Sequence, residues 1–365
     1  MGFTCGIVGL PNVGKSTLFN ALTSTQAAAA ANYPFCTIEP NTGRVPVPDP
    51  RLDRLGAIGQ SAKIIPTQLA FTDIAGLVRG ASKGEGLGNQ FLANIRETDA
   101  VLHVLRCFDG EVTHVEGGVD PLRDADIVDT ELMLADLEGL ERRIQAATKR
   151  ARGNDAEAKA ELALMERALA VLSDGKPARA MDRAADEEEA FRALQLLTSK
   201  PVLYICNVDE AAAVDGNGHS GKVAAKAAAE GTEAVVICAA IEEEIAQLTD
   251  PGERAEFLGS IGLEEPGLNR VIRAGYKKLG LITFFTVGPK EARAWTVTDG
   301  ATAPQAAGVI HTDFQRGFIR AETVDYDTFV ALGGEQACKD AGKMRQEGKD
   351  YRVADGDLFH FRFNV

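Results

Sequence analysis

The sequence predicts an α/β domain that is interrupted by a helical insertion and followed by a small β-rich domain. An apolar run at 3–10 ends in a glycine loop that leads into a helical pattern, as in α/β phosphate-binding domains. Residues from about 129 to 200 are rich in Ala, Leu, Glu and Arg, and β-prone apolar runs appear after 280. Because 365 residues are too many for one core, we expect several domains. Their predicted ranges are 1–128 with 201–279, then 129–200, then 280–365.

The glycine loop at 9–16 is a complete G-x-x-x-x-G-K-[ST] motif, Gly-Leu-Pro-Asn-Val-Gly-Lys-Ser. Its glycines let backbone N–H groups turn inward around phosphate oxygens, and the following helix begins with a partial positive charge. We expect Lys15 to reach the β- and γ-phosphates and the Ser16 hydroxyl to bind Mg²⁺. The predicted nucleotide-binding residues of this loop are Asn12, Val13, Gly14, Lys15, Ser16 and Thr17.

A second motif, Asp73-Ile-Ala-Gly76, follows the apolar run at 67–72. In P-loop enzymes such a motif holds the Mg²⁺ shell and senses the γ-phosphate, so Asp73 is a predicted metal ligand and Gly76 a predicted catalytic residue. The loop at 32–41, rich in Pro and Asn, offers Thr37 as a further Mg²⁺ ligand. On spacing alone three other threonines compete with it: Thr23, Thr25 and Thr42.

Residues 206–210, Cys-Asn-Val-Asp-Glu, stand where a GTPase would carry Asn-Lys-x-Asp to read guanine. Asn207 is retained, but Val208 replaces the Lys and Glu210 replaces the Asp. The longer Glu210 side chain should not place its carboxylate where the Asp of a GTPase accepts hydrogen bonds from N1–H and the exocyclic amine of guanine. Adenine has no donor at N1. We expect this mismatch to cost about 1.5–3 kcal/mol of guanine affinity. These substitutions argue against tight GTP selectivity and permit ATP, and a GTPase with a degenerate base site is the alternative.

Several blocks of sequence resemble the YchF family, the Obg-like ATPases. They are residues 9–17, Asn-Tyr-Pro-Phe-Cys-Thr-Ile-Glu-Pro-Asn at 32–41, 73–89, Phe-Leu-Ala-Asn-Ile-Arg-Glu at 91–97, His-Val-Glu-Gly at 114–117 and the Asn-Val-Asp-Glu stretch. The resemblance implies a Ras-like P-loop domain, a coiled-coil insertion and a C-terminal TGS domain of the β-grasp type. It also implies a preference for ATP over GTP and association with the ribosome. The resemblance favours Thr37 over the three competing threonines as the further Mg²⁺ ligand, because Thr37 matches the family's switch-I threonine.

Hydrolysis requires a group that orients water, and Leu77 stands where many Ras-like enzymes carry Gln. We expect His114, in a glycine-rich loop after the strand around His103, to position the water near Lys15 and Gly76. A loop histidine without a role is the alternative. In cation-dependent relatives an Asn at the position of Asn12 helps to bind K⁺, so K⁺ joins Mg²⁺ as an expected cofactor.

The net charge of −14 argues against a global nucleic-acid-binding surface, so RNA contact is expected only from local patches. One candidate patch lies in the insertion at 142–152, for which a solvated helix face is the alternative, and another is the TGS domain. The basic residues of the first patch are Arg142, Arg143, Lys149, Arg150 and Arg152. The six scattered cysteines predict reduced core thiols, and with no membrane span or signal peptide expected, the predicted location is the cytoplasm.

The sequence thus predicts a cytoplasmic ATP-hydrolysing switch that acts on the whole ribosome or its large subunit. Two alternatives are a GTP-specific ribosome-associated GTPase and a nucleotide-gated scaffold with negligible turnover.

Overall fold

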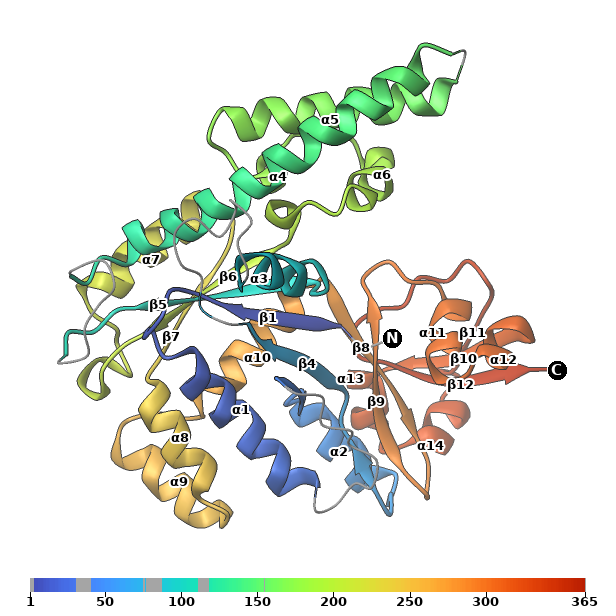
Figure 1. Cartoon of the computed structure of the whole chain (residues 1–365). Coiled ribbons are helices and arrows are strands. Elements are labelled where there is room, and N and C mark those ends of the chain that lie inside the picture. The colour runs from blue at the N-terminus through green and yellow to red at the C-terminus, as the bar shows by residue number, and fades with distance from the viewer. Residues whose placement is uncertain are drawn as a thin grey trace. The chain divides into compact units, whose positions relative to one another are not determined.

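The computed structural model describes residues 3–30, 41–74, 76, 87–110, 118–153 and 155–364 (Figure 1). The chain divides into two compact units. The first comprises Met1–Val45 and Ala70–Val271, and the second comprises Pro46–Leu69 and Ile272–Val365. The segment 46–69, which the sequence analysis assigns to the first domain, thus packs with the C-terminal residues.

The first unit is built on a sheet with the strand order β2-β4-β1-β5-β6-β7. Neighbouring strands from β4 to β7 pair in parallel. The central strands are buried along their length, which explains why their sequences are continuous apolar runs rather than alternating ones. The strands are β1 (Thr4–Val8), β2 (Thr42–Pro46), β4 (Gln68–Asp73), β5 (Ala100–Arg106), β6 (Val202–Asn207) and β7 (Ala234–Ile237).

Helices cover both faces of this sheet, as expected for parallel strands joined by helical crossovers (Figure 1). On one face α1 (Lys15–Ala30) packs against α8 (Ala239–Gln247), and on the other α4 (Pro121–Ala151) packs against α7 (Gly218–Ala229). The remaining helices of this part are α3 (Leu87–Arg96), α9 (Pro251–Ser260) and α10 (Gly267–Lys278), which continues into the second unit. The predicted P-loop α/β fold is therefore confirmed.

The helical insertion is an antiparallel pair made by α4 and α5 (Ala156–Ser173). Asp120 starts α4 by accepting hydrogen bonds from the backbone N–H groups of Leu122 and Arg123, and Pro121 occupies the first helical turn. Leu140 and Met165 lie in the shared core of the pair, whereas Leu134 is 44% exposed. Because α4 is continuous from Pro121, the predicted domain boundary at 128/129 falls inside a helix.

The chain returns from α5 through four short helices before it enters β6. They are η2 (Ala178–Ala180), η3 (Ala185–Glu187), α6 (Glu188–Ala193) and η4 (Leu197–Ser199). Asp136 of α4, which is 3% exposed, anchors η4. Its carboxylate accepts from the backbone N–H groups of Leu197 and Thr198 at 2.8 Å each, and from the Thr198 hydroxyl at 2.7 Å. Both oxygens are thus satisfied, as a buried carboxylate requires.

The second unit is built on a mixed six-stranded sheet with the order β11-β10-β12-β8-β9-β3. Phe284 and Phe285 are consecutive in β8 and point to opposite faces, so each lies in a separate hydrophobic core. The strands are β3 (Ile64–Ile65), β8 (Leu281–Val287), β9 (Ala292–Thr298), β10 (Phe318–Asp325), β11 (Arg345–Glu347) and β12 (Asp357–Phe363). The helices are α2 (Pro50–Ile58), α11 (Ala303–Ile310), α12 (Thr312–Arg316), α13 (Tyr326–Leu332) and α14 (Glu335–Asp340).

Specific contacts explain why 46–69 belongs to the second unit. β3 pairs in parallel with β9 as the edge strand of the mixed sheet. Arg51 of α2 forms an ion pair with Asp355 at 2.7 Å, and Asp355 also accepts from the backbone N–H of Thr283. The sequence does not predict the pairing of β3 with β9 or the ion pair of Arg51 with Asp355, because the partners in each lie more than 200 residues apart.

Among the described residues, no helix is both long enough and apolar enough to cross a membrane. The five described cysteines are free and buried, which agrees with the prediction of reduced core thiols.

We expect Asp136→Ala to lower the free energy of unfolding by about 3 kcal/mol, because three donors at η4 would lose their buried acceptor. Glu138→Ala is the matched control, since that side chain is 60% exposed and pairs only with Arg142 on the same helix. It should change stability by less than about 0.5 kcal/mol. Urea unfolding of both variants measures the difference, and equal effects would contradict the anchoring role of Asp136.

Candidate nucleotide-binding site

The glycine loop connects β1 to α1 at the carboxyl edge of the parallel sheet, where ligands of such folds bind. Gly9 packs against β5, and a Cβ there would lie 2.4 Å from the carbonyl oxygen of Val104. Asn12 and Gly14 adopt positive φ angles of 64° and 96°. These residues therefore turn the loop tightly and bring its backbone close to the end of α1.

Lys15 lies beneath this loop and is only 7% exposed. Its ammonium donates a hydrogen bond to the carbonyl oxygen of Leu10 at 2.7 Å. A Cβ on Gly76 would lie 3.1 Å from Lys15 Nζ, so the second motif reaches the phosphate loop. Burial lowers the pKa of Lys15 to about 8, although Asp73 opposes the shift. An anionic phosphate next to this ammonium would favour its charged form.

Ser16 and Asp73 face each other across the ends of α1 and β4. The Ser16 hydroxyl donates to Asp73 Oδ2 at 3.3 Å. Asp73 Oδ1 is buried and has no hydrogen-bond partner among the described residues, and burial raises the pKa of this carboxyl group. A hydroxyl and a carboxylate with an unsatisfied oxygen fit the preference of Mg²⁺ for hard oxygen ligands. This pair is therefore suited to hold the metal of a P-loop site.

Asn207, the last residue of β6, joins the glycine loop to α8. It is 4% exposed, and its amide donates to the carbonyl oxygen of Val13 at 3.0 Å. Its side-chain oxygen accepts from the backbone N–H of Ala239 at 3.0 Å. A Cβ on Gly14 would lie 2.3 Å from Asn207 Nδ2, so only glycine fits there. Asn207 thus connects the predicted phosphate and base regions of the site.

The residues after Asn207 separate into buried and exposed positions. Val208 is 2% exposed, and its backbone N–H donates to the carbonyl oxygen of Ile237. Asp209 caps the short helix η5 (Glu210–Ala212) by accepting from the backbone N–H of Ala212. Glu210 is exposed at the start of η5. The loop therefore exposes the Glu210 carboxylate at the position of the Asp of a guanine site, whereas Val208, at the position of the Lys, is buried.

The structure brings together many of the residues that the sequence predicted. The phosphate loop residues Asn12–Thr17 meet Asp73 and Gly76 near the ends of β1 and β4, and Asn207 contacts the same loop from β6. Thr37 and His114 lie outside the described residues. The sequence did not predict that the carbonyl oxygens of Leu10 and Val13 accept hydrogen bonds at this site, because every residue type has a backbone carbonyl.

The basic patch at 142–152 is partly neutralised by its neighbours. Arg150 forms an ion pair with Glu161 at 2.8 Å, and Arg142 forms one with Glu138 at 3.7 Å. Arg143 donates to the carbonyl oxygen of Leu194 at 2.6 Å. These contacts reduce the charge that this face could offer to a phosphate backbone.

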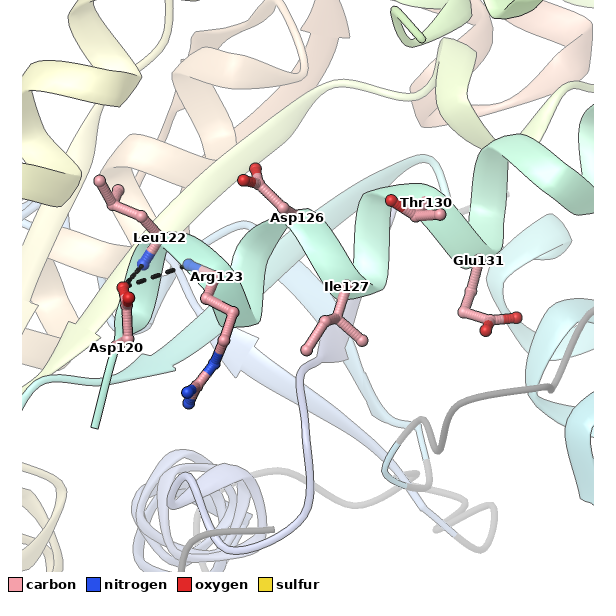
Figure 2. A pocket seen from close by; sticks show the side chains of 7 residues that line it. All are labelled: Asp120, Leu122, Arg123, Asp126, Ile127, Thr130 and Glu131. Atoms are coloured by element: carbon pink, nitrogen blue, oxygen red, sulfur yellow. Dashed lines mark hydrogen bonds between the residues drawn. The ribbon is translucent and has the colours of Figure 1, made fainter. Parts of the chain in front are cut away.

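A separate open pocket of about 560 Å³ runs along the first turns of α4 (Figure 2). Its lining residues all belong to α4 or to its N-cap: Asp120, Leu122, Arg123, Asp126, Ile127, Thr130 and Glu131. Figure 2 shows the Asp120 carboxylate turned to the N–H groups that it caps. None of the predicted site residues lines this pocket.

Comparison with known proteins agrees with this arrangement. A family model described as "50S ribosome-binding GTPase" matches residues 4–128, and the YchF-GTPase_C model, described as a protein of unknown function, matches 281–364. The chain is 60% identical over 366 residues to the "Ribosome-binding ATPase YchF" of Haemophilus influenzae and 51% identical over 368 residues to that of Bacillus subtilis, with complete coverage of each chain.

A solved structure, the YchF GTPase of Schizosaccharomyces pombe, matches with a TM-score of 0.89 and 38% identity. It covers 99% of this chain, and the match covers 98% of that one. The resemblance seen in the sequence is thereby confirmed over the whole length, and the chain belongs to the YchF family.

Proposed function

We propose that this protein is a Mg²⁺-dependent P-loop ATPase that binds the ribosome and alternates between nucleotide states. The observation that carries this proposal is the geometry of Lys15, Ser16 and Asp73 around the glycine loop. The names of the H. influenzae and B. subtilis relatives, which are ribosome-binding ATPases, support the choice of nucleotide and partner.

In this proposal the chain acts mainly by positioning and by electrostatic stabilisation. Lys15 neutralises charge on the β- and γ-phosphates, and backbone N–H groups of the glycine loop, including that of Gly14, bind the phosphate oxygens. Ser16, Asp73 and Thr37 hold Mg²⁺, which would supply a positive charge next to the leaving phosphate. Gly76 senses the γ-phosphate, and His114 positions the attacking water. We also propose that Asn12 assists a K⁺ ion beside the phosphates.

The base site is proposed to select ATP through Asn207, Val208 and Glu210. Val208 supplies apolar contact and backbone groups, and no Lys stem packs on the base. Glu210 cannot place its carboxylate where an Asp would accept from guanine N1–H. The exposed position of Glu210 supports the part of this proposal that concerns its carboxylate.

We propose three functional parts: a P-loop domain, the helical insertion, and a C-terminal TGS domain within 280–365, with 46–69 packed in the same unit as the last of these. Contact with the ribosome, through its large subunit or both subunits, would use local patches at 142–152 and in the TGS domain. The ion pairs of Arg142 and Arg150 favour a small contact made by Lys149 and Arg152 rather than a broad basic surface. The expected location remains the cytoplasm.

The base-site proposal predicts that Val208→Lys with Glu210→Asp shifts selectivity from ATP toward GTP by about 10- to 100-fold. The reason is that the two substitutions restore the Lys side chain that packs on guanine and the Asp carboxylate that accepts hydrogen bonds from it. Titration of nucleotide-free protein with fluorescent ATP and GTP analogues, in Mg²⁺ and K⁺, measures the ratio. Glu243→Asp, an exposed change on α8, is the matched control. Tight GTP binding by the unmodified protein would favour the alternative of a GTP-specific enzyme.

The lowered pKa of Lys15 predicts proton uptake when ATP binds in alkaline solution. In the free protein the ammonium loses its proton as the pH rises through about 8, whereas the bound phosphates favour the charged form. Binding at pH 9 should therefore take up close to one proton, and ATP affinity should fall by up to ~10-fold per pH unit above 8. Calorimetry in buffers of different ionisation enthalpy measures this uptake. Equal proton exchange at pH 7 and pH 9 would show that Lys15 does not titrate there.

The ribosome proposal predicts faster ATP turnover in the presence of ribosomes, because Leu77 offers no group that orients water. The experiment compares phosphate release by the unmodified protein with and without purified ribosomes, and with separated subunits. Lys15→Ala is the control, since it removes the phosphate contact and should abolish both rates. Ribosome binding without any gain in turnover would favour the alternative of a nucleotide-gated scaffold.

A further inference from the structure

The helical insertion rejoins the sheet at a residue that also contacts the end of α3. η4 and Lys200 form this return, and β6 begins at Val202. α3 is the described helix that follows Asp73 and Gly76 along the chain. α3 and the insertion thus meet at Lys200.

Lys200 binds the carboxyl end of α3. Its ammonium donates to the carbonyl oxygen of Arg96 at 3.0 Å and to that of Thr98. Arg96 is the last residue of α3, and terminal carbonyl groups of a helix lack partners within it and carry partial negative charge. Burial lowers the pKa of Lys200, because the ammonium has been taken partly out of water. Backbone carbonyls of α3 therefore hold this cation at a fixed place.

The end of α3 is packed against the segment that carries Asp73. Thr98 is 3% exposed, and its hydroxyl donates to the carbonyl oxygen of Ile95 at 2.9 Å. Gly6 of β1 lies between Thr98 and Ile74, and a Cβ on it would lie 2.9 Å from Thr98 Cγ2 and 2.8 Å from Ile74 Cδ1. Thr98 and Ile74, the residue after Asp73, therefore both pack against Gly6. We expect a shift at Asp73 to reach Thr98 through this close packing.

On the other side, η4 is bound firmly to the insertion. Asp136 of α4 holds the N–H groups of Leu197 and Thr198, as described above. The Thr198 hydroxyl also accepts from the backbone N–H of Ala178 at 3.0 Å, in the segment that follows α5. A displacement of Lys200 would therefore also displace η4, which is hydrogen-bonded to α4 and to the segment after α5.

We propose that Lys200 couples the helical insertion to α3, so that the nucleotide bound at the glycine loop alters the insertion. This inference rests on the proposed function, in which Gly76 senses the γ-phosphate and the protein alternates between nucleotide states. Because coupling between sites is reciprocal, a partner that binds the insertion would change nucleotide affinity by the same factor.

Hydrogen–deuterium exchange of the full-length protein tests the coupling, with a non-hydrolysable ATP analogue and Mg²⁺ in one sample and ADP in the other. In the unmodified protein, peptides covering α3 and peptides covering α4 and η4 should both change their exchange rates, on the order of fivefold or more. Lys200→Met should keep the change in α3 and lose it in the insertion. Lys176→Met is the matched control, since that lysine is 64% exposed in the same insertion and its ion pair among the described residues is with Asp174, two positions away.

Lys200→Gln, which keeps a polar end but is shorter, is a second variant in case the first does not fold, and it should lose the insertion response as well. An insertion response that persists in a folded Lys200 variant would overturn the coupling role. A wild-type response in α3 without one in the insertion would also overturn it, while the proposed switch would stand. No response in either segment would overturn the nucleotide switch itself and the inference with it.

Discussion

The contact between Asn207 and the glycine loop is the constraint on which the rest of the site depends. One amide side chain donates to Val13 and accepts from Ala239, so β6, the phosphate loop and α8 share a single buried group. The loop can approach this amide only because residue 14 has no side chain. The spacing between the phosphate region and the base region is therefore set inside the protein, before any ligand binds, which lowers the entropic cost of binding.

This constraint also explains why the base loop can vary without disturbing the phosphate site. Asn207 uses both of its polar atoms within the protein, whereas Val208 and Glu210 take no part in that connection. Val208 is fixed by its backbone to Ile237, and Glu210 extends from η5 into solvent. The hydrogen bonds that join Asn207 to the glycine loop and to α8 therefore do not depend on the side chains of Val208 and Glu210.

Much of the fold could be predicted from residues close together in the sequence. The wrong predictions concern contacts between residues that are far apart in it. The glycine motif, the buried strands and the long α4 were predictable because each depends on residues close together in sequence. The assignment of 46–69 was not, since it depends on pairing of β3 with β9 and on the bond from Arg51 to Asp355. The contacts of Lys200 could not be predicted either, because its partners are backbone carbonyls.

Asp136, which is buried, and Asp73, which is half-buried, are two carboxylates of the first unit with different hydrogen-bond partners. Burial raises the pKa of both Asp73 and Asp136, so the environment alone does not distinguish them. Asp136 satisfies both oxygens with three donors, which makes it a fixed structural acceptor. Asp73 uses one oxygen for Ser16 and keeps the other without a hydrogen bond among the described residues. A buried, unsatisfied carboxylate oxygen costs stability, and such a cost is retained where a cation can offset it. Asp136 therefore serves the architecture of the insertion, and the unsatisfied oxygen of Asp73 supports its proposed role as a metal ligand.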